Sequence, residues 1–241
     1  MNQERSGRRS ILRRHIPEYA TEITLILVSL GLLVFAGLTG RMINGETGFF
    51  DQRVLLWFRN SEDLADPIGP ELLEVVVRDI TALGGVIVLA LICLFVLGVL
   101  CLRKLYGLAG FVLVSVVAGS LMNTLLKEII ARPRPDIVPH ATDAALSSFP
   151  SGHTMMSTIV YLTLGALLSL STNNTRIKLY ILAWSIVLPF MVGVSRLYLG
   201  VHWPTDIIAG WIAGATWSLL CLLIYDHLLA PATVTGGDKS R

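Results

Sequence analysis

The chain has 241 residues, a formal net charge of +2, 54% hydrophobic residues and 15% charged residues. Soluble domains have about 45–50% apolar residues and about 25% charged ones. A domain of this length still presents a large surface to water, so one soluble core cannot absorb the surplus of apolar side chains. The composition therefore excludes an ordinary soluble domain. The small net charge gives no support to a nucleic-acid partner.

Six apolar stretches are long enough, or nearly so, to cross a bilayer, which takes about 20 residues of helix. They run over 23–40, 84–102, 105–126, 153–170, 179–194 and 207–229. The pattern predicts an all-α, polytopic membrane bundle with six transmembrane helices. The domain is expected at 23–229, between a basic tail at 1–22 and a second tail at 230–241. The three cysteines (Cys93, Cys101 and Cys221) fall inside apolar runs without metal-ligand spacing, so we interpret them as small hydrophobes.

The segment between the first two spans, residues 41–83, mixes aromatic and charged residues. Phe49, Phe50 and the run 55–58 alternate with charges, which is typical of a helix lying at the membrane interface. The sequence predicts such an interfacial helix. It leaves open whether the helix only caps the bundle or also contacts a substrate.

Basic residues predict the orientation of the bundle, because cytoplasmic loops are enriched in Lys and Arg. With the N-terminus inside, 11 of the 19 basic residues fall on the inner side: Arg5, Arg8, Arg9, Arg13, Arg14, Arg103, Lys104, Arg176, Lys178, Lys239 and Arg241. Three of the remaining residues are given a chemical role below. The bias predicts that both termini are cytoplasmic.

Three polar clusters interrupt the apolar pattern, and this topology places all three at the outer face. Residues 127–135 read KEIIARPRP at the end of the third span, and 150–153 read PSGH at the start of the fourth. Residues 195–206 read SRLYLGVHWPTD between the fifth and sixth spans. Ionisable groups so close to hydrocarbon are costly and usually mark a functional site.

The basic and small residues of these clusters fit an anion site. Lys127, Arg134 and Arg196 would repel one another in a poorly hydrated pocket unless an anion filled it, and guanidinium groups match phosphate oxygens with paired hydrogen bonds. Ser151 and Gly152 stand where a helix begins, so free backbone N–H groups and the helix dipole would point at the same anion. The pattern predicts a phosphate cradle built without a metal.

Two histidines fit the roles of nucleophile and acid. His202 and Asp206 are four residues apart, and Pro204 is suited to be the first residue of the sixth helix. Asp206 can then hold one imidazole nitrogen, which leaves the other free to attack phosphorus. His153 lies on another helix, where it can act as general acid to the leaving oxygen.

The spacing of these residues resembles the type 2 phosphatidic acid phosphatases, which share a core with vanadium haloperoxidases and glucose-6-phosphatase. The family pattern is Lys, six residues, Arg-Pro; then Pro-Ser-Gly-His; then Ser-Arg, five residues, His, three residues, Asp. This sequence matches every position: Lys127, Arg134 and Pro135; Pro150 to His153; Ser195, Arg196, His202 and Asp206.

The resemblance implies a metal-independent lipid phosphatase that needs no cofactor. By likeness, His202 would form a phosphohistidine, Asp206 would orient it, and His153 would protonate the leaving group and then activate water. The phosphate would be held by Lys127, Arg134, Ser151, Gly152 and Arg196. Neither line of reasoning requires a metal, since the nearby acidic residues Glu128, Asp136 and Asp143 form no evident ligand cage.

The expected substrate is a membrane lipid with a phosphomonoester or diphosphate headgroup: a polyprenyl diphosphate, phosphatidylglycerophosphate or phosphatidate. An outward-facing site in a bacterial plasma membrane favours the polyprenyl carrier. Residues 136–149 are expected to form the pocket rim, with solvated roles for His140 and Asp143. Arg132 is either an extra phosphate contact or an anchor for the helix end.

Two other functions fit parts of the pattern. A lipid phosphotransferase would use the same histidine and differ only in its acceptor. A membrane transporter would carry polar residues deep in several spans, whereas here the ionisable residues gather at one face. Gly210 and Gly214 would permit close helix packing, but they leave the oligomeric state open.

Overall fold

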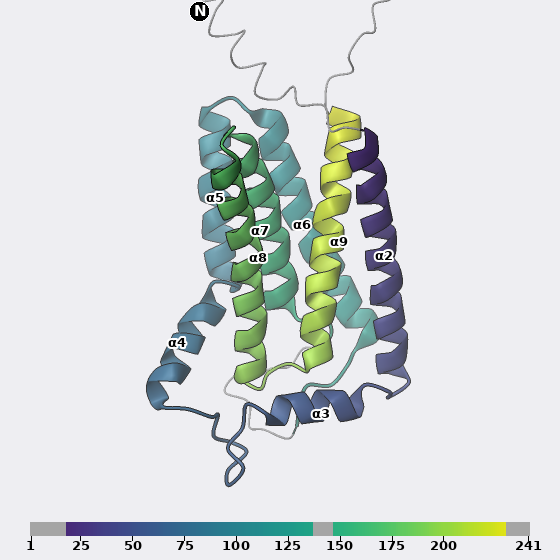
Figure 1. The fold of residues 1–241 in the computed structure, drawn as a ribbon, viewed down its shortest axis with the longest axis vertical. Helices are drawn as coiled ribbons and strands as arrows, with labels where there is room; N and C mark the ends of the chain where they lie inside the picture. The colour runs from purple at the N-terminus through teal and green to yellow at the C-terminus, as the bar shows by residue number, and fades with distance from the viewer. Residues whose placement is uncertain (1–17, 137–146, 230–241) are drawn as a thin grey trace, which may run out of the picture.

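The computed structural model describes residues 18–136 and 147–229, and within these ranges the chain folds into eight helices (Figure 1). They are α2 (Glu18–Ile43), α3 (Gly48–Leu56), α4 (Glu71–Ala82), α5 (Val86–Leu102), α6 (Tyr106–Ile130), α7 (Gly152–Leu170), α8 (Thr175–Tyr198) and α9 (Pro204–Leu229). The predicted all-helical fold is confirmed. The predicted C-terminal tail and most of the N-terminal one lie outside the described residues.

The helices have the length and surface of membrane spans. Five of those in the described ranges are long and apolar enough to cross a bilayer, and a sixth span results if α4 and α5, bent by 44° at a short break, are taken together. Apolar side chains such as Leu33, Ile87 and Phe95 are more than 70% exposed. Hydrocarbon, rather than water, is the solvent that such a surface fits. The chain is a multi-pass membrane protein.

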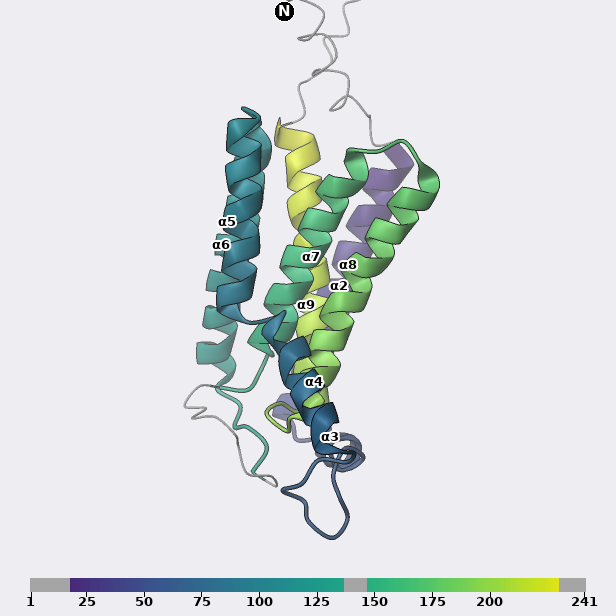
Figure 2. The same ribbon diagram turned by 90° about the vertical axis from the view of Figure 1, so that its left-hand side faces the viewer.

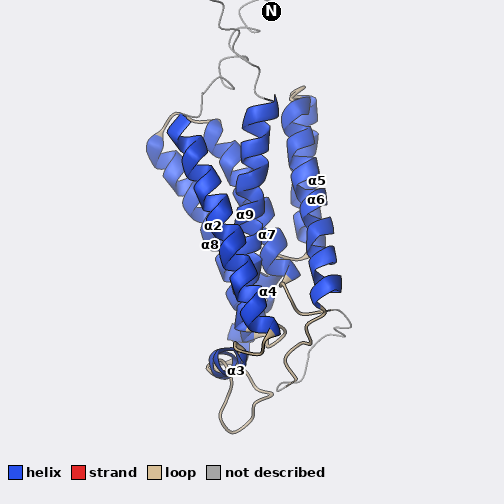
Figure 3. Ribbon diagram, turned by 90° about the vertical axis from the view of Figure 1, so that its right-hand side faces the viewer, coloured by secondary structure: helices blue, strands red, loops and turns tan. Residues whose placement is uncertain are grey.

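Helix α7 occupies the middle of the bundle and packs against α5, α6, α8 and α9. Its buried Met155 and Ile159 meet Ala213 of α9 in a shared apolar core. Figure 2 shows α5 and α6 as an adjacent pair on one side of α7, and α2 packs on α9 at the other side. Figure 3 shows helices joined by loops throughout the described ranges.

The segment after α2 contains two helices where the sequence predicted one. Helix α3 lies across the end of the bundle (Figure 1), with Asp51 and Leu55 buried and the aromatic side chains of Phe49 and Trp57 exposed. This is the amphipathic arrangement expected of an interfacial helix. Helix α4 has no buried residue and leads through the 44° bend into α5.

The two ends of the described chain lie together. Helix α2 begins and α9 ends at the end of the bundle opposite α3 (Figure 1). Helices α6 and α8 end, and α7 and α9 begin, at the α3 end. The three polar clusters therefore share one face of the bundle, as the predicted topology requires.

Helices α7 and α9 approach so closely that two glycines of α9 are required. A Cβ on Gly210 would lie 3.1 Å from the Ser151 carbonyl oxygen, and one on Gly214 would lie 2.8 Å from the Met155 carbonyl oxygen. Both neighbours are backbone atoms, which cannot turn aside. The glycine pair therefore serves packing within one chain.

Replacing Gly214 with Ala should destabilise the fold. The new methyl group would press on the α7 backbone, and overpacking of this kind costs about 1–3 kcal/mol. The matched control is Gly37→Ala in α2, where a Cβ meets nothing within 4 Å and helix propensity favours Ala by up to about 1 kcal/mol. Thermal unfolding in detergent should show a lower midpoint for G214A than for G37A, and equal midpoints would contradict this packing.

Candidate active site

Backbone hydrogen bonds join the three predicted segments into one site. The Ser148 N–H donates to the Arg132 carbonyl at 2.8 Å, which joins the first segment to the residues just before the second. The Ser151 N–H donates to the Asp206 carbonyl at 3.1 Å, which ties the second segment to the third. Residues distant in the sequence are thus held together by main-chain atoms at the start of α7.

The first segment enters the site through a left-handed turn. Helix α6 ends at Ile130. The next residue, Ala131, has a φ of +46°, and its N–H donates to the Lys127 carbonyl at 3.0 Å. This arrangement satisfies an end carbonyl of the helix and turns the chain sharply. A non-glycine residue in this conformation costs about 1–2 kcal/mol. The turn sends Arg132 and Arg134 back over the end of the bundle.

The predicted pair of His202 and Asp206 is present at the start of α9, which begins at Pro204 as expected. Asp206 Oδ2 lies 3.4 Å from His202 Nδ1 and accepts a 2.9 Å hydrogen bond from the Trp203 backbone N–H. His202 is 1% exposed and Asp206 is fully buried. The spacing between imidazole and carboxylate is long for a hydrogen bond, and catalytic contacts of this kind often tighten only when substrate binds.

Burial lowers the pKa of His202 to about 4, because the charged imidazolium loses its hydration. The Asp206 carboxylate opposes this shift, while the charges of Arg196 and Arg134 add to it. At neutral pH the imidazole is therefore uncharged, which is the form that can act as a nucleophile.

The predicted basic residues act electrostatically on this pair and on one another. Lys127 interacts electrostatically with Arg134, Asp206 and Arg196. Lys127 donates to the Ser147 carbonyl at 2.9 Å, Arg134 to the Val201 carbonyl at 2.9 Å, and Arg196 to the Thr81 hydroxyl at 3.3 Å.

Two of these cations have no carboxylate partner within the part of the chain that the structure describes. Among the described residues, Lys127 and Arg196 form no salt bridge, and the buried Nε of Arg196 has no hydrogen-bond partner. Both side chains are at least partly buried. Positive charge held this way, close to hydrocarbon, is stabilised when an anion binds between the side chains.

The start of α7 provides part of the predicted phosphate cradle. A Cβ on Gly152 would lie 3.2 Å from Asn123 Nδ2 and 3.6 Å from Lys127 Cε, so Gly152 brings the helix end close to the lysine. Ser151 Oγ accepts from the Thr154 hydroxyl at 3.0 Å, which leaves its own hydroxyl able to donate. The sequence predicted that the Ser151 N–H would be free for an anion, but it donates instead to the Asp206 carbonyl.

His153 lies in the first turn of α7, at the same end of the bundle as His202. It interacts electrostatically with Arg196, His202, Lys127 and Arg134. The break between α4 and α5 packs against the His153 backbone, since a Cβ on Gly84 would lie 3.2 Å from the His153 carbonyl oxygen. The two histidines therefore share one site.

The sequence did not predict that Asp51 belongs to this site. Asp51 comes from α3 and is 1% exposed, and its Oδ2 lies 2.7 Å from Arg132 Nη2. Arg132 Nη1 in turn lies 2.6 Å from Asp206 Oδ1. Arg132 thus bridges two carboxylates, a position different from both alternatives, phosphate contact or simple helix anchor. Asn123 is a second residue that the sequence did not single out; its buried Oδ1 has no hydrogen-bond partner among the described residues.

Most of the predicted pocket rim, including His140 and Asp143, lies outside the described residues. Of the described part of the rim, Ser147 contacts Lys127. Within the described ranges, no group of three or more His, Cys, Asp or Glu side chains is arranged to hold a metal ion.

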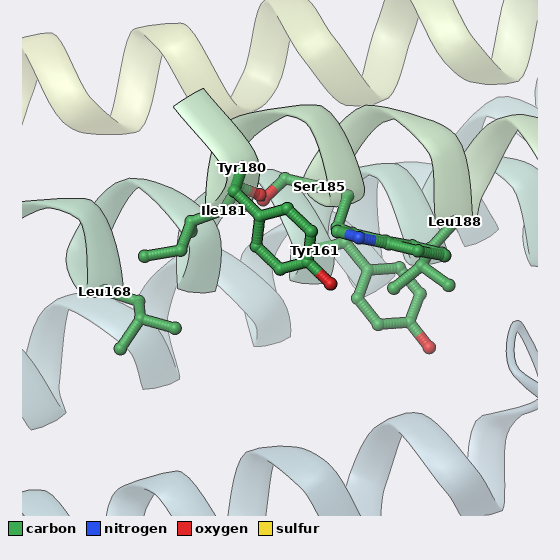
Figure 4. Close-up of a pocket in the computed structure, with 7 residues that line it drawn as sticks. Tyr161, Leu168, Tyr180, Ile181, Ser185 and Leu188 are labelled. Atoms are coloured by element: carbon green, nitrogen blue, oxygen red, sulfur yellow. The ribbon is translucent and has the colours of Figure 1, made fainter. Parts of the chain in front are cut away.

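A shallow groove of about 320 Å³ lies elsewhere, between α7 and α8 (Figure 4). Its lining is mostly apolar and aromatic, and consists of Tyr161, Leu168, Tyr180, Ile181, Trp184, Ser185 and Leu188. These residues lie beyond the first turn of α7 and before the end of α8. They are away from Lys127, Arg134 and Arg196, which we call the cationic cluster. The groove has none of the charged groups that a phosphate needs.

The family model described as the PAP2 superfamily matches residues 108–229, which is about half of the chain and contains all three polar segments. The chain belongs to this superfamily. The match includes every residue predicted for the site, whereas Asp51 lies before it.

Two curated relatives show the range of proteins to which the chain is similar. It is 40% identical to phosphatidylglycerophosphatase B of Bacillus subtilis over 99 residues, covering 39% of this chain and 46% of the relative. It is 33% identical to an undecaprenyl-diphosphatase of Sulfolobus acidocaldarius over 119 residues, covering 46% of this chain and 52% of the relative. The chain thus spans about half the length of the curated relatives it matches.

A solved structure extends the similarity over most of the chain. The crystal structure of a transmembrane PAP2-type phosphatidylglycerolphosphate phosphatase from Bacillus subtilis has a TM-score of 0.67 and 26% identity, covering 85% of this chain and 96% of the other. The helices outside the family match therefore also follow a PAP2 arrangement.

His202 should stay uncharged until the pH falls to about 4. A histidine with a lowered pKa gains its proton only below the usual value of about 6.5, so between these two pH values the folded chain should hold a neutral His202. Nitrogen-15 NMR of histidine-labelled protein in detergent measures this, with His202→Asn assigning the signal. The unfolded chain is the control, and its histidines should titrate near pH 6.5. A folded His202 that also titrates there would contradict the burial argument.

Proposed function

We propose that this chain is a membrane lipid phosphatase that forms a phosphohistidine on His202. The observation that carries the proposal is that two partly buried cations, Lys127 and Arg196, form no salt bridge among the described residues, in a site whose His202 is neutral. Such a site favours an anion and offers a nucleophile to it. Relatives named as lipid phosphatases support the same assignment.

In the first step, His202 Nε2 attacks the phosphorus while the bond from phosphorus to the leaving lipid oxygen breaks. Asp206, next to Nδ1, orients the ring and stabilises the positive charge that develops on it. His153 gives its proton to the leaving oxygen. A bound phosphate supplies the negative charge that favours the protonated form of His153.

In the second step, water attacks the phosphorus of the phosphohistidine and the N–P bond breaks. His153, now neutral, accepts the proton of the water. Inorganic phosphate leaves and both histidines return to their starting forms. Throughout, Lys127, Arg134, Arg196, the Ser151 hydroxyl and the N–H groups at the start of α7, opened to the anion by Gly152, stabilise charge on the phosphoryl oxygens.

The location of the site favours an amphiphilic substrate. The cationic cluster lies where the apolar spans end and the interfacial helix α3 crosses the bundle. A lipid can place its headgroup there while its tails stay in hydrocarbon. We assign the catalytic domain to residues 23–229, with the termini in the cytoplasm of a bacterium and the site on the outer face of the plasma membrane, because the basic residues favour that orientation.

Replacing the nucleophile should abolish hydrolysis. His202→Asn should lower phosphate release from a lipid phosphate in detergent by a factor of about 10³ or more, as loss of a nucleophile does elsewhere. The wild type should keep its activity in excess chelator. The control is His227→Asn, an exposed histidine near the opposite end of α9. Near-wild-type turnover in H202N, or loss of wild-type activity to chelator with recovery on adding magnesium, would refute this mechanism.

The headgroup preference needs a substrate panel. We rank a polyprenyl diphosphate first because an outward site suits a carrier lipid used outside the cell. Phosphatidylglycerophosphate is the second candidate because of the Bacillus subtilis relative. Phosphate release from both, and from phosphatidate, should be compared at equal surface concentration, with and without lipid acceptors. The expected result is the highest kcat/KM for the polyprenyl diphosphate and no transfer. A preference for phosphatidylglycerophosphate, or phosphate recovered on an acceptor, would overturn the ranking.

A further inference from the structure

Helix α3 contributes a buried carboxylate to the site from outside the three motif segments. Asp51 Oδ2 accepts from Arg132 Nη2 at 2.7 Å and from the Thr205 hydroxyl at 2.8 Å, and its Oδ1 accepts from the Thr205 backbone N–H at 3.0 Å. The Arg132 side chain is only 12% exposed. Both oxygens of Asp51 are therefore committed to fixed donors in a region shielded from water.

Arg132 passes this constraint on to Asp206. Its Nη1 donates to Asp206 Oδ1 at 2.6 Å and to the Thr205 hydroxyl at 2.7 Å. With Oδ1 held by Arg132 and Oδ2 held by the Trp203 N–H, the plane of the Asp206 carboxylate is fixed. Oδ2 is then the oxygen that faces His202 Nδ1.

The charges in this chain of contacts also matter. One guanidinium lies between two carboxylates, so its positive charge is shared between Asp51 and Asp206. Were Asp51 absent, Arg132 would be balanced by Asp206 alone. Asp206 would then hold the Nδ1 proton less firmly, because a carboxylate with its own full counter-charge is a weaker acceptor.

We propose that Asp51 is a positioning residue for the pair of His202 and Asp206, acting through Arg132. It keeps the Asp206 carboxylate oriented and able to accept a strong hydrogen bond, so that His202 carries its proton on Nδ1 and offers Nε2 to phosphorus. This assignment rests on the proposed function for its kinetic consequence. The tautomer of His202 is a property of the resting protein and does not depend on turnover.

The alternative is that Asp51 has a purely structural role, and the experiment must distinguish it from the positioning role. The Thr205 N–H lies at the first turn of α9, where a carboxylate also stabilises the helix end. A change in stability alone therefore decides nothing. The measurements must follow the proton on His202 and the coupling to Asp206.

The test compares Asp51→Asn with Glu46→Gln, an exposed acidic residue just before α3 whose replacement changes the net charge equally. In D51N we expect kcat to fall about 10- to 100-fold, the loss seen when the hydrogen-bond partner of a metal-bound histidine is removed, with KM changed by less than about threefold. Nitrogen-15 NMR should show the proton of His202 on Nδ1 in the wild type and E46Q, and a raised share on Nε2 in D51N. The double variant D51N/D206N should be no slower than D206N, because the two act in one chain.

Each outcome decides the proposal. An unchanged His202 tautomer in folded D51N, or rate losses that multiply in D51N/D206N, would overturn it. Should D51N fail to fold, Arg132→Lys takes its place: it keeps the charge but loses the fork, and it should show the same tautomer change and loss of kcat. If the wild type releases no phosphate from any lipid, the proposed function fails, while the tautomer comparison still tests Asp51.

Discussion

The close contact between α7 and α9 is the constraint on which the site depends. Because Gly210 and Gly214 have no side chains, the start of α7 lies against the first turns of α9, and the Ser151 N–H reaches the Asp206 carbonyl. This contact brings the segment that carries His153 to the segment that carries His202. A larger residue at either glycine would press on the α7 backbone, and in the proposed mechanism this would disturb the spacing between the two histidines.

Around this contact the charges fall into two groups with different tasks. Arg132 is balanced by Asp51 and Asp206, and this group holds the protein together at the end of the bundle. Lys127 and Arg196 form no ion pair among the described residues, and their positive charge remains for a ligand. In the proposed mechanism the balanced group orients Asp206, and the other two cations attract the phosphate.

The sequence predicted much of this because the motif residues have fixed spacings and the spans have a clear length. Helix type, the approximate bounds of the six apolar stretches and the convergence of the three polar segments followed from those patterns. The role of Asp51 did not, because its contact with Arg132 spans 81 positions and nothing nearby marks it as more than a charge on an interfacial helix. The left-handed Ala131 was equally hidden, since Ala has no preference for that conformation. The commitment of the Ser151 N–H to Asp206 depends on how two helices pack, which spacing along one chain does not reveal.

The three polar segments lie at one face of the bundle, so the reagents and products of the proposed reaction meet the protein at one surface. Released phosphate enters the water there, while the dephosphorylated lipid stays in the leaflet in which it was bound. Polar headgroups cross hydrocarbon slowly because their desolvation is costly. In the proposed reaction the return of that lipid to the other leaflet is therefore a separate task, and a cell that reuses the lipid needs a flipping step beside this protein.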